Sequence, residues 1–366
     1  MNPTLHSTPD SPGLFSRFFA SSWLRPLNDL SALEDLVSLV DPFLSLTRVR
    51  ARVVARYRET PDAVTLTLQP NHLWKGHRAG QHVGVEVEID GRRLHRVFSL
   101  SSPPMSDGLL RITVKQHERG KVSAWWNRRA GVGDIVTLTQ AAGAFVLPSP
   151  LPLRIVMLSA GSGVTPLMAM LRELHGSRAG VDVVFVQAAR SREDTIFVAE
   201  LERLAREWPR LDLRLHYSSE KGRLDPAAMA ALAAESRDAV TFACGPTGFL
   251  ELVREAWREA GLEQSLHEER FGAPRRESSV EGSHAVVTTQ AGREFEAHEG
   301  RSLLEEAEAA GLRPANGCRV GICHTCKCRK LSGVVEDLRD GSLHSEDGET
   351  IQLCVMSARS AVTLDL

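Results

Sequence analysis

Residues 316–328, with the sequence NGCRVGICHTCKC, contain the pattern that decides how the end of this chain folds. Cys318, Cys323 and Cys326 stand in the spacing C-x4-C-x2-C, and Cys354 follows further along in the segment IQLCVMS. A tight loop that supplies three thiolates, completed by one distant thiolate, is the arrangement that holds a 2Fe–2S cluster. The sequence therefore predicts an iron–sulfur centre with these four cysteines as ligands.

Other interpretations of the same stretch fit the spacing less well. Four-cysteine zinc sites usually contain two C-x2-C pairs, whereas only one such pair is present here. Cys328 falls outside the spacing, so we expect it to remain unliganded. His324 could replace a thiolate as in a Rieske centre, but four thiolates are already available. Gly317 and Gly321 allow the backbone to fold closely around the sulfurs.

The composition excludes several classes of protein. The chain has 366 residues, a formal net charge of −2 and no basic tail, which argues against nucleic-acid binding. Its six cysteines are too few for a disulfide-stapled scaffold of this length. The first residues lack a secretory signal pattern, and the most apolar long window, 151–170, contains Arg154 and small polar residues. We therefore expect no membrane span and a cytoplasmic protein whose thiols stay reduced.

The pattern of apolar residues divides the chain into five segments. Residues 1–47 form an N-terminal extension with helical periodicity. Residues 48–149 contain six short alternating runs, which are typical of a small antiparallel barrel. Residues 150–270 alternate apolar strands with helical stretches, which is typical of a parallel sheet covered by helices. Residues 271–283 are polar and turn-rich, as in a linker, and residues 284–366 carry the cysteine pattern.

Two short motifs in the barrel segment have the chemistry of a phosphate and ring site. Residues 96–99, RVFS, combine Arg96, whose guanidinium can fork onto a diphosphate, with Phe98, whose ring can lie against another flat ring. Residues 120–123, GKVS, follow a strand-like run and precede a helical stretch. A phosphate at a helix N-terminus meets unpaired N–H groups and a favourable dipole.

A second glycine-rich motif lies in the parallel-sheet segment. Residues 161–166, GSGVTP, follow the strand-like run RIVMLSA and precede a helical stretch. Glycines at such a turn let the backbone approach the pyrophosphate of a dinucleotide. A later strand-like run, VTFACGP, ends in Cys244, Gly245 and Pro246.

Together these motifs resemble the ferredoxin–NADP reductase superfamily, in the branch with a plant-type 2Fe–2S ferredoxin domain fused to the C-terminus. The resemblance covers about residues 49–366. It implies a multidomain protein of α/β and β domains: a six-stranded antiparallel flavin-binding barrel, a parallel-sheet α/β nucleotide-binding domain and a β-grasp ferredoxin domain. It also implies FAD, with FMN as the alternative, because the GKVS form is more similar to the FAD-binding members.

Two positions depart from the family's motifs. Phe98 stands where the RxYS motif has tyrosine, which removes one hydrogen bond to the flavin but keeps the stacking surface. Ala79 replaces the proline of a PGQ turn, whose Gly80 and Gln81 are present.

The resemblance assigns roles to individual residues. Ser99 would hydrogen-bond the flavin N5 and Cys244 would lie beside the nicotinamide C4, which makes them the candidate catalytic residues. The other candidate flavin residues are Gly80, Gln81, Arg96, Val97, Phe98, Val114, Gly120, Lys121, Val122 and Ser123. The other candidate nucleotide residues are Gly161, Gly163, Val164, Thr165, Pro166, Arg190, Arg192, Lys221, Arg223, Gly245 and Pro246.

The choice between NADPH and NADH depends on the charges that follow the second strand of the nucleotide domain. An NADH enzyme often presents a carboxylate to the ribose 2′-hydroxyl there. Here Arg190 and Arg192 occupy this stretch. These cations favour NADPH, and the neighbouring Glu193 and Asp194 leave NADH open.

The implied function is an electron relay from NAD(P)H to FAD, to the 2Fe–2S cluster and on to an external acceptor protein. The cofactors supply the chemistry and the protein positions them. Our preferred acceptor is a membrane fatty-acyl desaturase or a related hydroxylase. One alternative is a Rieske-type ring-hydroxylating oxygenase or demethylase. Another is a stand-alone flavin or ferric reductase that needs no acceptor protein.

Two surface features bear on the acceptor. Residues 14–46 form a helix-like stretch with several aromatic residues, which is similar to the desaturase-partner branch. It would either touch the inner face of a membrane or fold back over the barrel. Around the cluster loop, Arg319, Lys327, Arg329 and Lys330 are expected to form a basic patch for an acidic acceptor; the alternative is a solvated loop.

Overall fold

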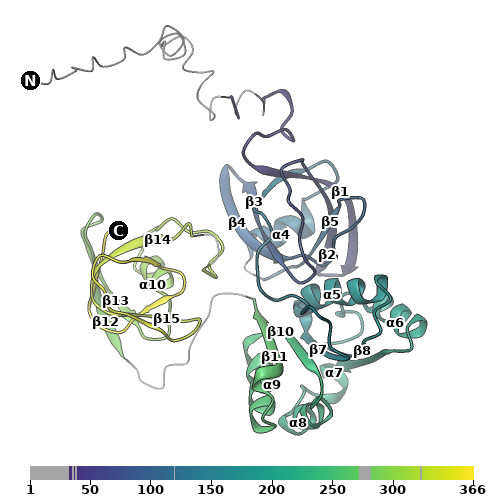
Figure 1. Cartoon of the computed structure of the whole chain (residues 1–366). Coiled ribbons are helices and arrows are strands. Elements are labelled where there is room, and N and C mark those ends of the chain that lie inside the picture. Colours follow the sequence, from purple (N-terminus) through teal and green to yellow (C-terminus); the bar gives the residue numbers. More distant parts are fainter. Residues whose placement is uncertain (1–32, 35–36, 38, 119, 272–281, 322–323) are drawn as a thin grey trace, which may run out of the picture.

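The computed structural model describes residues 33–34, 37, 39–118, 120–271, 282–321 and 324–366. Within these residues the chain forms a barrel, a parallel-sheet domain and a C-terminal β-rich domain, in that order (Figure 1). Most of the predicted N-terminal extension and most of the predicted linker lie outside the described residues.

The barrel is one six-stranded sheet with the order β4-β3-β6-β1-β2-β5 and antiparallel pairing throughout. Its strands are β1 (Val49–Thr60), β2 (Ala63–Pro70), β3 (His82–Ile89), β4 (Arg92–Ser99), β5 (Leu110–Lys115) and β6 (Ile135–Leu138). Helix α4 (Lys121–Arg128) inserts the fully buried Trp126 into the barrel core. The predicted six-stranded antiparallel barrel is confirmed.

The second domain is a five-stranded parallel sheet with the order β11-β10-β7-β8-β9. Its strands are β7 (Arg154–Ala160), β8 (Asp182–Ala189), β9 (Leu211–Tyr217), β10 (Val240–Gly245) and β11 (Leu266–Arg270). Its helices are α5 (Val164–Gly176), α6 (Val198–Glu207), α7 (Ser218–Lys221), α8 (Pro226–Glu235) and α9 (Thr247–Glu259), with the 3-10 turns η1 (Gly161–Gly163) and η2 (Glu263–Ser265).

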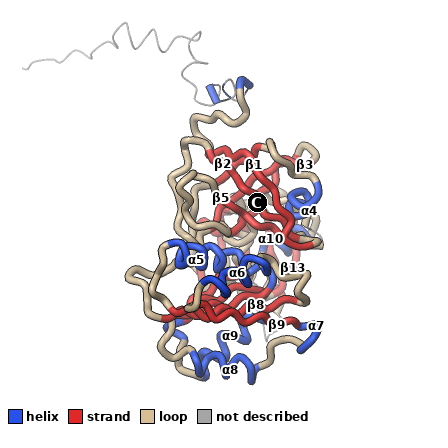
Figure 2. Tube along the Cα trace, turned by 90° about the vertical axis from the view of Figure 1, so that its right-hand side faces the viewer, coloured by secondary structure: helices blue, strands red, loops and turns tan. Residues whose placement is uncertain are grey.

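This sheet is buried on both faces. Figure 2 shows α5 and α6 on one side of it and α8 and α9 on the other. Two separate apolar cores fill these two sides. Chain order reverses at β7, which lies between β8 and β10. A ligand is therefore expected outside the carboxyl ends of β7 and β10.

The C-terminal domain has a five-stranded sheet, β13-β12-β19-β14-β17, and a small sheet, β16-β15-β18. Its elements are β12 (Ser283–Thr288), β13 (Arg293–His298), α10 (Leu303–Ala309), β14 (Lys327–Ser332), β15 (Val335–Asp337), β16 (Leu343–His344), β17 (Thr350–Gln352), β18 (Met356–Ala358) and β19 (Val362–Leu364). Helix α10 begins at the N-cap Ser302, whose side chain accepts from the Glu305 amide. Its buried face, with Leu303 and Leu304, belongs to the domain core.

The described end of the N-terminal extension contacts the barrel at Phe43, whose ring centre lies 4.7 Å from the Arg52 guanidinium carbon of β1, and leaves two apolar residues exposed. The Leu39 and Val40 side chains are 84% and 81% exposed. Glu34 accepts hydrogen bonds from Ser45 Oγ at 2.5 Å and from the Leu46 amide at 2.8 Å. It is therefore bound to the segment that directly precedes β1. Among the described residues, no helix combines the length and the apolarity needed to cross a membrane.

Candidate functional site

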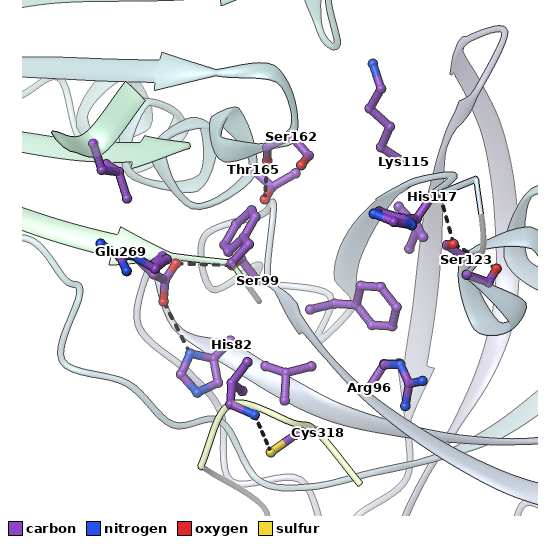
Figure 3. A pocket seen from close by; sticks show the side chains of 18 of the residues that line it. His82, Arg96, Ser99, Lys115, His117, Ser123, Ser162, Thr165, Glu269 and Cys318 are labelled. Carbon is purple, nitrogen blue, oxygen red and sulfur yellow. Dashed lines mark hydrogen bonds and ion pairs between the residues drawn. The ribbon is translucent and has the colours of Figure 1, made fainter. Parts of the chain in front are cut away.

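A cavity of about 1310 Å³ is lined by all three domains (Figure 3). The predicted cofactor residues that line it are Arg96, Val97, Phe98, Ser99, Val114, Gly120, Val122, Ser123 and Thr165, together with the predicted cluster ligand Cys318. The other predicted residues lie outside its lining: Gly80, Gln81, Lys121, Gly161, Gly163, Val164, Pro166, Arg190, Arg192, Lys221, Arg223, Cys244, Gly245 and Pro246. The flavin motif, the nucleotide loop and the cluster loop therefore share one cavity.

Strand β4 runs along this cavity and contacts one neighbouring domain from Arg96, near its middle, and the other from Ser99, at its end. Arg96 Nη1 donates to the Gly317 carbonyl of the cluster loop at 3.1 Å and to the carbonyl of His95 at 2.7 Å. Ser99 Oγ donates to Glu269 Oε2, on β11 of the parallel-sheet domain, at 3.2 Å. A strand rises about 3.3 Å per residue, so these two contacts are separated by about 10 Å along the strand. A flavin between them would lie between both neighbouring domains.

The N-terminus of α4 forms a recess that suits a phosphate. Ser123 Oγ donates to the Gly120 carbonyl at 3.1 Å and accepts from the His117 amide at 3.0 Å. A Cβ on Gly120 would lie 2.4 Å from Ser123 Oγ, so only glycine keeps this recess open. Lys115 and His117 line the cavity here, and the unpaired N–H groups of the helix favour an anion. These residues fit the diphosphate of FAD.

Gly80 and Gln81 shape a turn rather than the cavity wall. Gly80 has a φ of +94°, and a Cβ there would lie 2.1 Å from the Phe145 carbonyl oxygen. The Gln81 side chain accepts from the Arg78 amide at 2.9 Å and donates to the Gly143 carbonyl at 3.3 Å. The pair therefore positions the start of β3, and its predicted contact with the flavin remains a prediction.

The glycine-rich loop stands at the carboxyl end of β7, as predicted. Gly161 has a φ of +56°, and a Cβ there would meet no atom within 4 Å. A Cβ on Gly163 would lie 2.0 Å from the Cys244 carbonyl oxygen, because the loop packs directly on the backbone of β10. Thr165 Oγ1 donates to the Ser162 carbonyl at 3.0 Å. The loop is thus held tightly on its β10 side and is open at Gly161, where a nucleotide can approach.

Cys244 lies at the end of β10, behind the cavity wall. Its side chain is fully buried, and burial, together with the charge of Glu269, raises the pKa of the thiol well above its usual value. A Cβ on the next residue, Gly245, would lie 2.8 Å from the Phe249 ring. The thiol at this position is therefore neutral and tightly packed.

Glu269 is the site residue that sequence reasoning missed. Its Oε2 accepts from Ser99, and its Oε1 lies 3.4 Å from His82 Nδ1 (Figure 3). His82 and Ser99 are direct partners across β3 and β4. Within the described part of the chain, His82 Nε2 is buried and has no hydrogen-bond partner. No local motif marks Glu269; it reaches the site because β11 pairs in parallel with β10, which places it opposite Cys244.

The cations predicted for NADPH stand on the same edge of the sheet but outside the cavity. Arg190 Nε donates to Asp194 at 2.8 Å, and Arg192 Nη2 donates to Glu202 at 2.9 Å. The hydrogen bond to Glu202 raises the pKa of Arg192. Both arginines are exposed, so a phosphate reaching them would compete with carboxylates that are already bound.

The described cysteines of the C-terminal domain separate into a group and an outlier. A hydrogen bond between the buried Cys326 and Cys354 thiols lowers the pKa of Cys326 to about 6 and raises that of Cys354. Cys318 is close enough for its charge to act on Cys354. Cys328 Sγ instead lies 3.6 Å from the Asp365 carbonyl oxygen, and burial raises its pKa to about 11. Cys323, the remaining predicted ligand, lies outside the described residues.

The cluster loop is fixed by contacts on both sides. Arg319 adopts a φ of +62° and its guanidinium forms two hydrogen bonds with Glu308, at 2.9 and 2.6 Å. Gln352 Nε2 donates to the Gly321 carbonyl at 3.0 Å and lies 2.7 Å from His324 Nδ1. The contact between Cys326 and Cys354, with Cys318 near them, fits a 2Fe–2S cluster, and among the described residues His324 contacts the Gln352 amide.

The prediction of a basic patch is wrong for one of its four residues. Lys330 is completely buried, because its Nζ donates to the carbonyls of Gly333 and Glu346, both at 2.7 Å. Arg319 is paired with Glu308. Lys327 and Arg329 remain exposed beside the loop.

Comparison with known families agrees with this three-part architecture. Residues 50–146 match the oxidoreductase FAD-binding domain, residues 157–255 the oxidoreductase NAD-binding domain and residues 287–359 the 2Fe-2S iron-sulfur cluster binding domain. Among solved structures, phthalate dioxygenase reductase, a modular structure for electron transfer from pyridine nucleotides to [2Fe-2S], is similar with a TM-score of 0.62 and 25% identity over 87% of this chain and 98% of that one.

Two curated proteins are similar over most of their length. An NADPH oxidoreductase of Mycobacterium tuberculosis is 36% identical over 91% of this chain and 88% of its own. The glycine betaine monooxygenase reductase subunit of Chromohalobacter salexigens is 32% identical over 87% of this chain and 95% of its own. With the cavity that joins the three domains, these similarities show that the chain belongs to the family of electron-transfer oxidoreductases that combine FAD, a nicotinamide nucleotide and a C-terminal 2Fe–2S domain in the arrangement of phthalate dioxygenase reductase.

Proposed function

We propose that this chain is the reductase component of an oxygenase or demethylase system, and that it passes electrons from NADPH through FAD and the cluster to a separate oxygenase. The observation that carries this proposal is the single cavity lined by flavin-motif residues, by Thr165 of the nucleotide loop and by Cys318. FAD and the cluster supply the redox chemistry when bound, and the residues of the chain hold and orient them.

The choice of an oxygenase rests on the relatives. They include reductase subunits of glycine betaine monooxygenase, stachydrine N-demethylase and 3-ketosteroid-9-alpha-monooxygenase. These names support an oxygenase or demethylase, which was the alternative acceptor in the sequence analysis, and do not support the preferred desaturase. The expected membrane contact through residues 14–46 was linked to a desaturase acceptor, and an oxygenase acceptor does not require it.

We assign the flavin diphosphate to the recess formed by Gly120, Ser123 and Lys115, and the isoalloxazine ring to the region of Phe98. Ser99 has one hydroxyl proton, which it donates to Glu269. Its oxygen can therefore only accept a hydrogen bond from a bound group. Such an acceptor favours a flavin whose N5 carries a proton, so Ser99 would stabilise the state that follows hydride arrival.

We assign the pyrophosphate of the nucleotide to the open face at Gly161 and the nicotinamide to the region of Thr165 and Cys244. NADPH is preferred because Arg190, Arg192, Lys221 and Arg223 provide cations at this edge of the sheet. The named relatives include both an NADPH oxidoreductase, 36% identical, and an NADH oxidoreductase, 31% identical. A comparison of kcat/KM for the two nucleotides decides between them.

The test of the proposed function is reconstitution with candidate acceptors. The purified protein, loaded with FAD and cluster, is combined with a Rieske-type oxygenase or demethylase from the same source, or with desaturase-containing membranes. Substrate turnover that requires this chain, with the oxygenase but not the membranes, is the expected result. Turnover with the membranes alone would restore the desaturase. Full reduction of a small flavin substrate with no acceptor in either system would indicate a stand-alone reductase.

A further inference from the structure

We propose that Arg96 is a positioning residue that holds the cluster loop on the flavin cavity and places a positive charge beside the cluster. The sequence assigns Arg96 only to the flavin diphosphate. In the structure its guanidinium reaches the ferredoxin domain, where Nη1 donates to the Gly317 carbonyl at 3.1 Å across 221 positions of sequence. The role as a positioning residue for electron transfer rests on the proposed function.

The carbonyl that Arg96 binds has a fixed position. Gly317 directly precedes Cys318, and the residues on either side of this pair, Asn316 and Arg319, are both bound to Glu308 of α10. Arg319 forms its two hydrogen bonds with Glu308, and Asn316 Nδ2 lies 3.4 Å from Glu308 Oε1. Arg96 therefore binds a loop whose shape is already fixed by its contacts with α10. The bond from Arg96 orients the cluster ligand Cys318 toward the cavity.

The charge of Arg96 is also directed at the cluster. Among the described residues, Arg319 has a carboxylate partner in Glu308, whereas Arg96 forms no ion pair with a carboxylate. Burial and the positive charge of Arg319 lower the pKa of Arg96, and the charge of Cys318 acts in the opposite direction. A 2Fe–2S cluster with four thiolates is an anion that becomes more negative on reduction, so a neighbouring cation stabilises its reduced form.

The two roles of Arg96 are compatible. Both of its hydrogen bonds use Nη1, and a guanidinium has five N–H donors. One arginine can therefore contact a flavin phosphate and the Gly317 carbonyl together. Electron transfer from a bound flavin to a bound cluster would then depend on a residue that touches both sites.

The first experiment measures the midpoint potential of the cluster by a redox titration followed by electron paramagnetic resonance. It uses the full-length, cluster-loaded protein and does not require bound flavin. Arg96→Gln is expected to lower the potential relative to wild type, because it removes a cation from an anionic centre. Arg96→Lys, which keeps the charge, and Arg92→Gln, which removes an exposed charge from the same strand, are expected to stay close to wild type. An Arg96→Gln potential equal to that of Arg92→Gln would overturn the electrostatic part of the proposal.

The second experiment follows flavin bleaching and cluster reduction separately after rapid mixing with NADPH, with each rate expressed per bound flavin. Losing a hydrogen bond to a charged group shifts an equilibrium roughly tenfold or more, so cluster reduction in Arg96→Gln is expected to slow by that factor. Arg96→Lys should be intermediate, because an ammonium cannot reproduce the fork. Unchanged cluster reduction in Arg96→Gln would contradict the holding role. If neither NADPH nor NADH reduces the flavin of the wild-type protein, the proposed function is rejected. The midpoint potential of the cluster would still test the role of Arg96 in that case.

Discussion

At each of the two domain boundaries of this protein an arginine donates a hydrogen bond to a main-chain carbonyl of the neighbouring domain, but the two arginines differ in their other contacts. At the boundary between barrel and nucleotide domain, Arg172 of α5 donates to the main-chain carbonyl of Ser101. At the boundary between barrel and ferredoxin domain, Arg96 donates to the main-chain carbonyl of Gly317. Arg172 is also paired with Glu200, at 2.5 and 3.0 Å, and its guanidinium lies 4.8 Å from the Phe197 ring centre. Arg96 has no carboxylate partner among the described residues.

This difference indicates a fixed boundary and a releasable one. Hydride transfer needs a nucleotide and a flavin in constant register, and the arginine at the first boundary is itself held in place by an ion pair and an aromatic contact within its own domain. A cluster must receive an electron on one side and deliver it on the other. Among the described residues the Arg96 contact has no such support, and one hydrogen bond to a charged group contributes about 1.5–3 kcal/mol, so this contact can open at low cost.

The largest expected effect comes from removing the cluster itself. Cys354→Ser should abolish cluster assembly, because the cluster loses one of four thiolates, and should leave flavin reduction by NADPH in place. Cytochrome c reduction is then expected to fall by roughly a hundredfold or more, with loss of the iron–sulfur absorbance. Cys328→Ser is the matched control, since Cys328 Sγ contacts the Asp365 carbonyl and not the other thiols. Loss of the cluster in both variants would contradict the assignment.

The next effect separates the two boundaries. Arg172→Ala leaves the half-buried Glu200 without its partner and should lower the free energy of unfolding by about 2–3 kcal/mol. Arg96→Ala should lower the free energy of unfolding by less than Arg172→Ala does, because it leaves no buried carboxylate unpaired, while cluster reduction slows. Denaturant unfolding of both variants checks this. Equal losses of stability would remove the distinction between a fixed and a releasable boundary.

A smaller effect is expected at Glu269. Glu269→Ala removes the acceptor that orients Ser99 and His82, and flavin reduction by NADPH should slow roughly tenfold. Electron transfer from flavin to cluster, measured per reduced flavin, should change little, because this contact belongs to the nucleotide side. The exposed Glu263→Ala serves as control. Slower cluster reduction with unchanged flavin reduction would contradict this assignment, because Glu269 would then act at the boundary with the ferredoxin domain.

The smallest effect is a pH dependence of the fixed boundary. Burial tends to raise the pKa of Glu200, but the hydrogen bonds and charge of Arg172 outweigh it and hold the pKa below the usual 4.5. The resulting stabilisation is present above about pH 4.5 and is lost as the pH falls from there through the lower folded pKa. The Tm difference between wild type and Glu200→Gln should therefore stay constant from pH 7 to about pH 5 and shrink as the pH falls below 4.5. A difference that grows on acidification would reject this assignment.

Local patterns predicted the parts of the site that are continuous in sequence. The cysteine spacing, RVFS, GKVS and GSGVTP each place several functional atoms on one turn or strand, so their chemistry can be recognised without the fold. The barrel and the parallel sheet followed from the change of apolar periodicity near residue 150.

What the sequence did not predict depends on long-range placement. Glu269 and His82 meet because β11, β10 and two antiparallel barrel strands bring them together, and no spacing encodes that contact. Arg96 was assigned to one ligand because its motif is local, whereas Gly317 lies in another domain. The sequence predicts Lys330 as a surface cation, because the sequence shows its charge but not its burial. Its burial follows from two carbonyls, of Gly333 and Glu346, that only the folded loop provides.

Lys330 therefore offers an internal reporter of opening of the ferredoxin domain. Its amine is enclosed while both carbonyls remain in place, whereas Lys327, three positions earlier, is exposed. An amine-modifying reagent should label Lys327 in the folded protein and Lys330 only in molecules whose C-terminal domain has transiently unfolded. The ratio of the two labels, read by mass spectrometry, thus measures how often this domain opens, without any added probe.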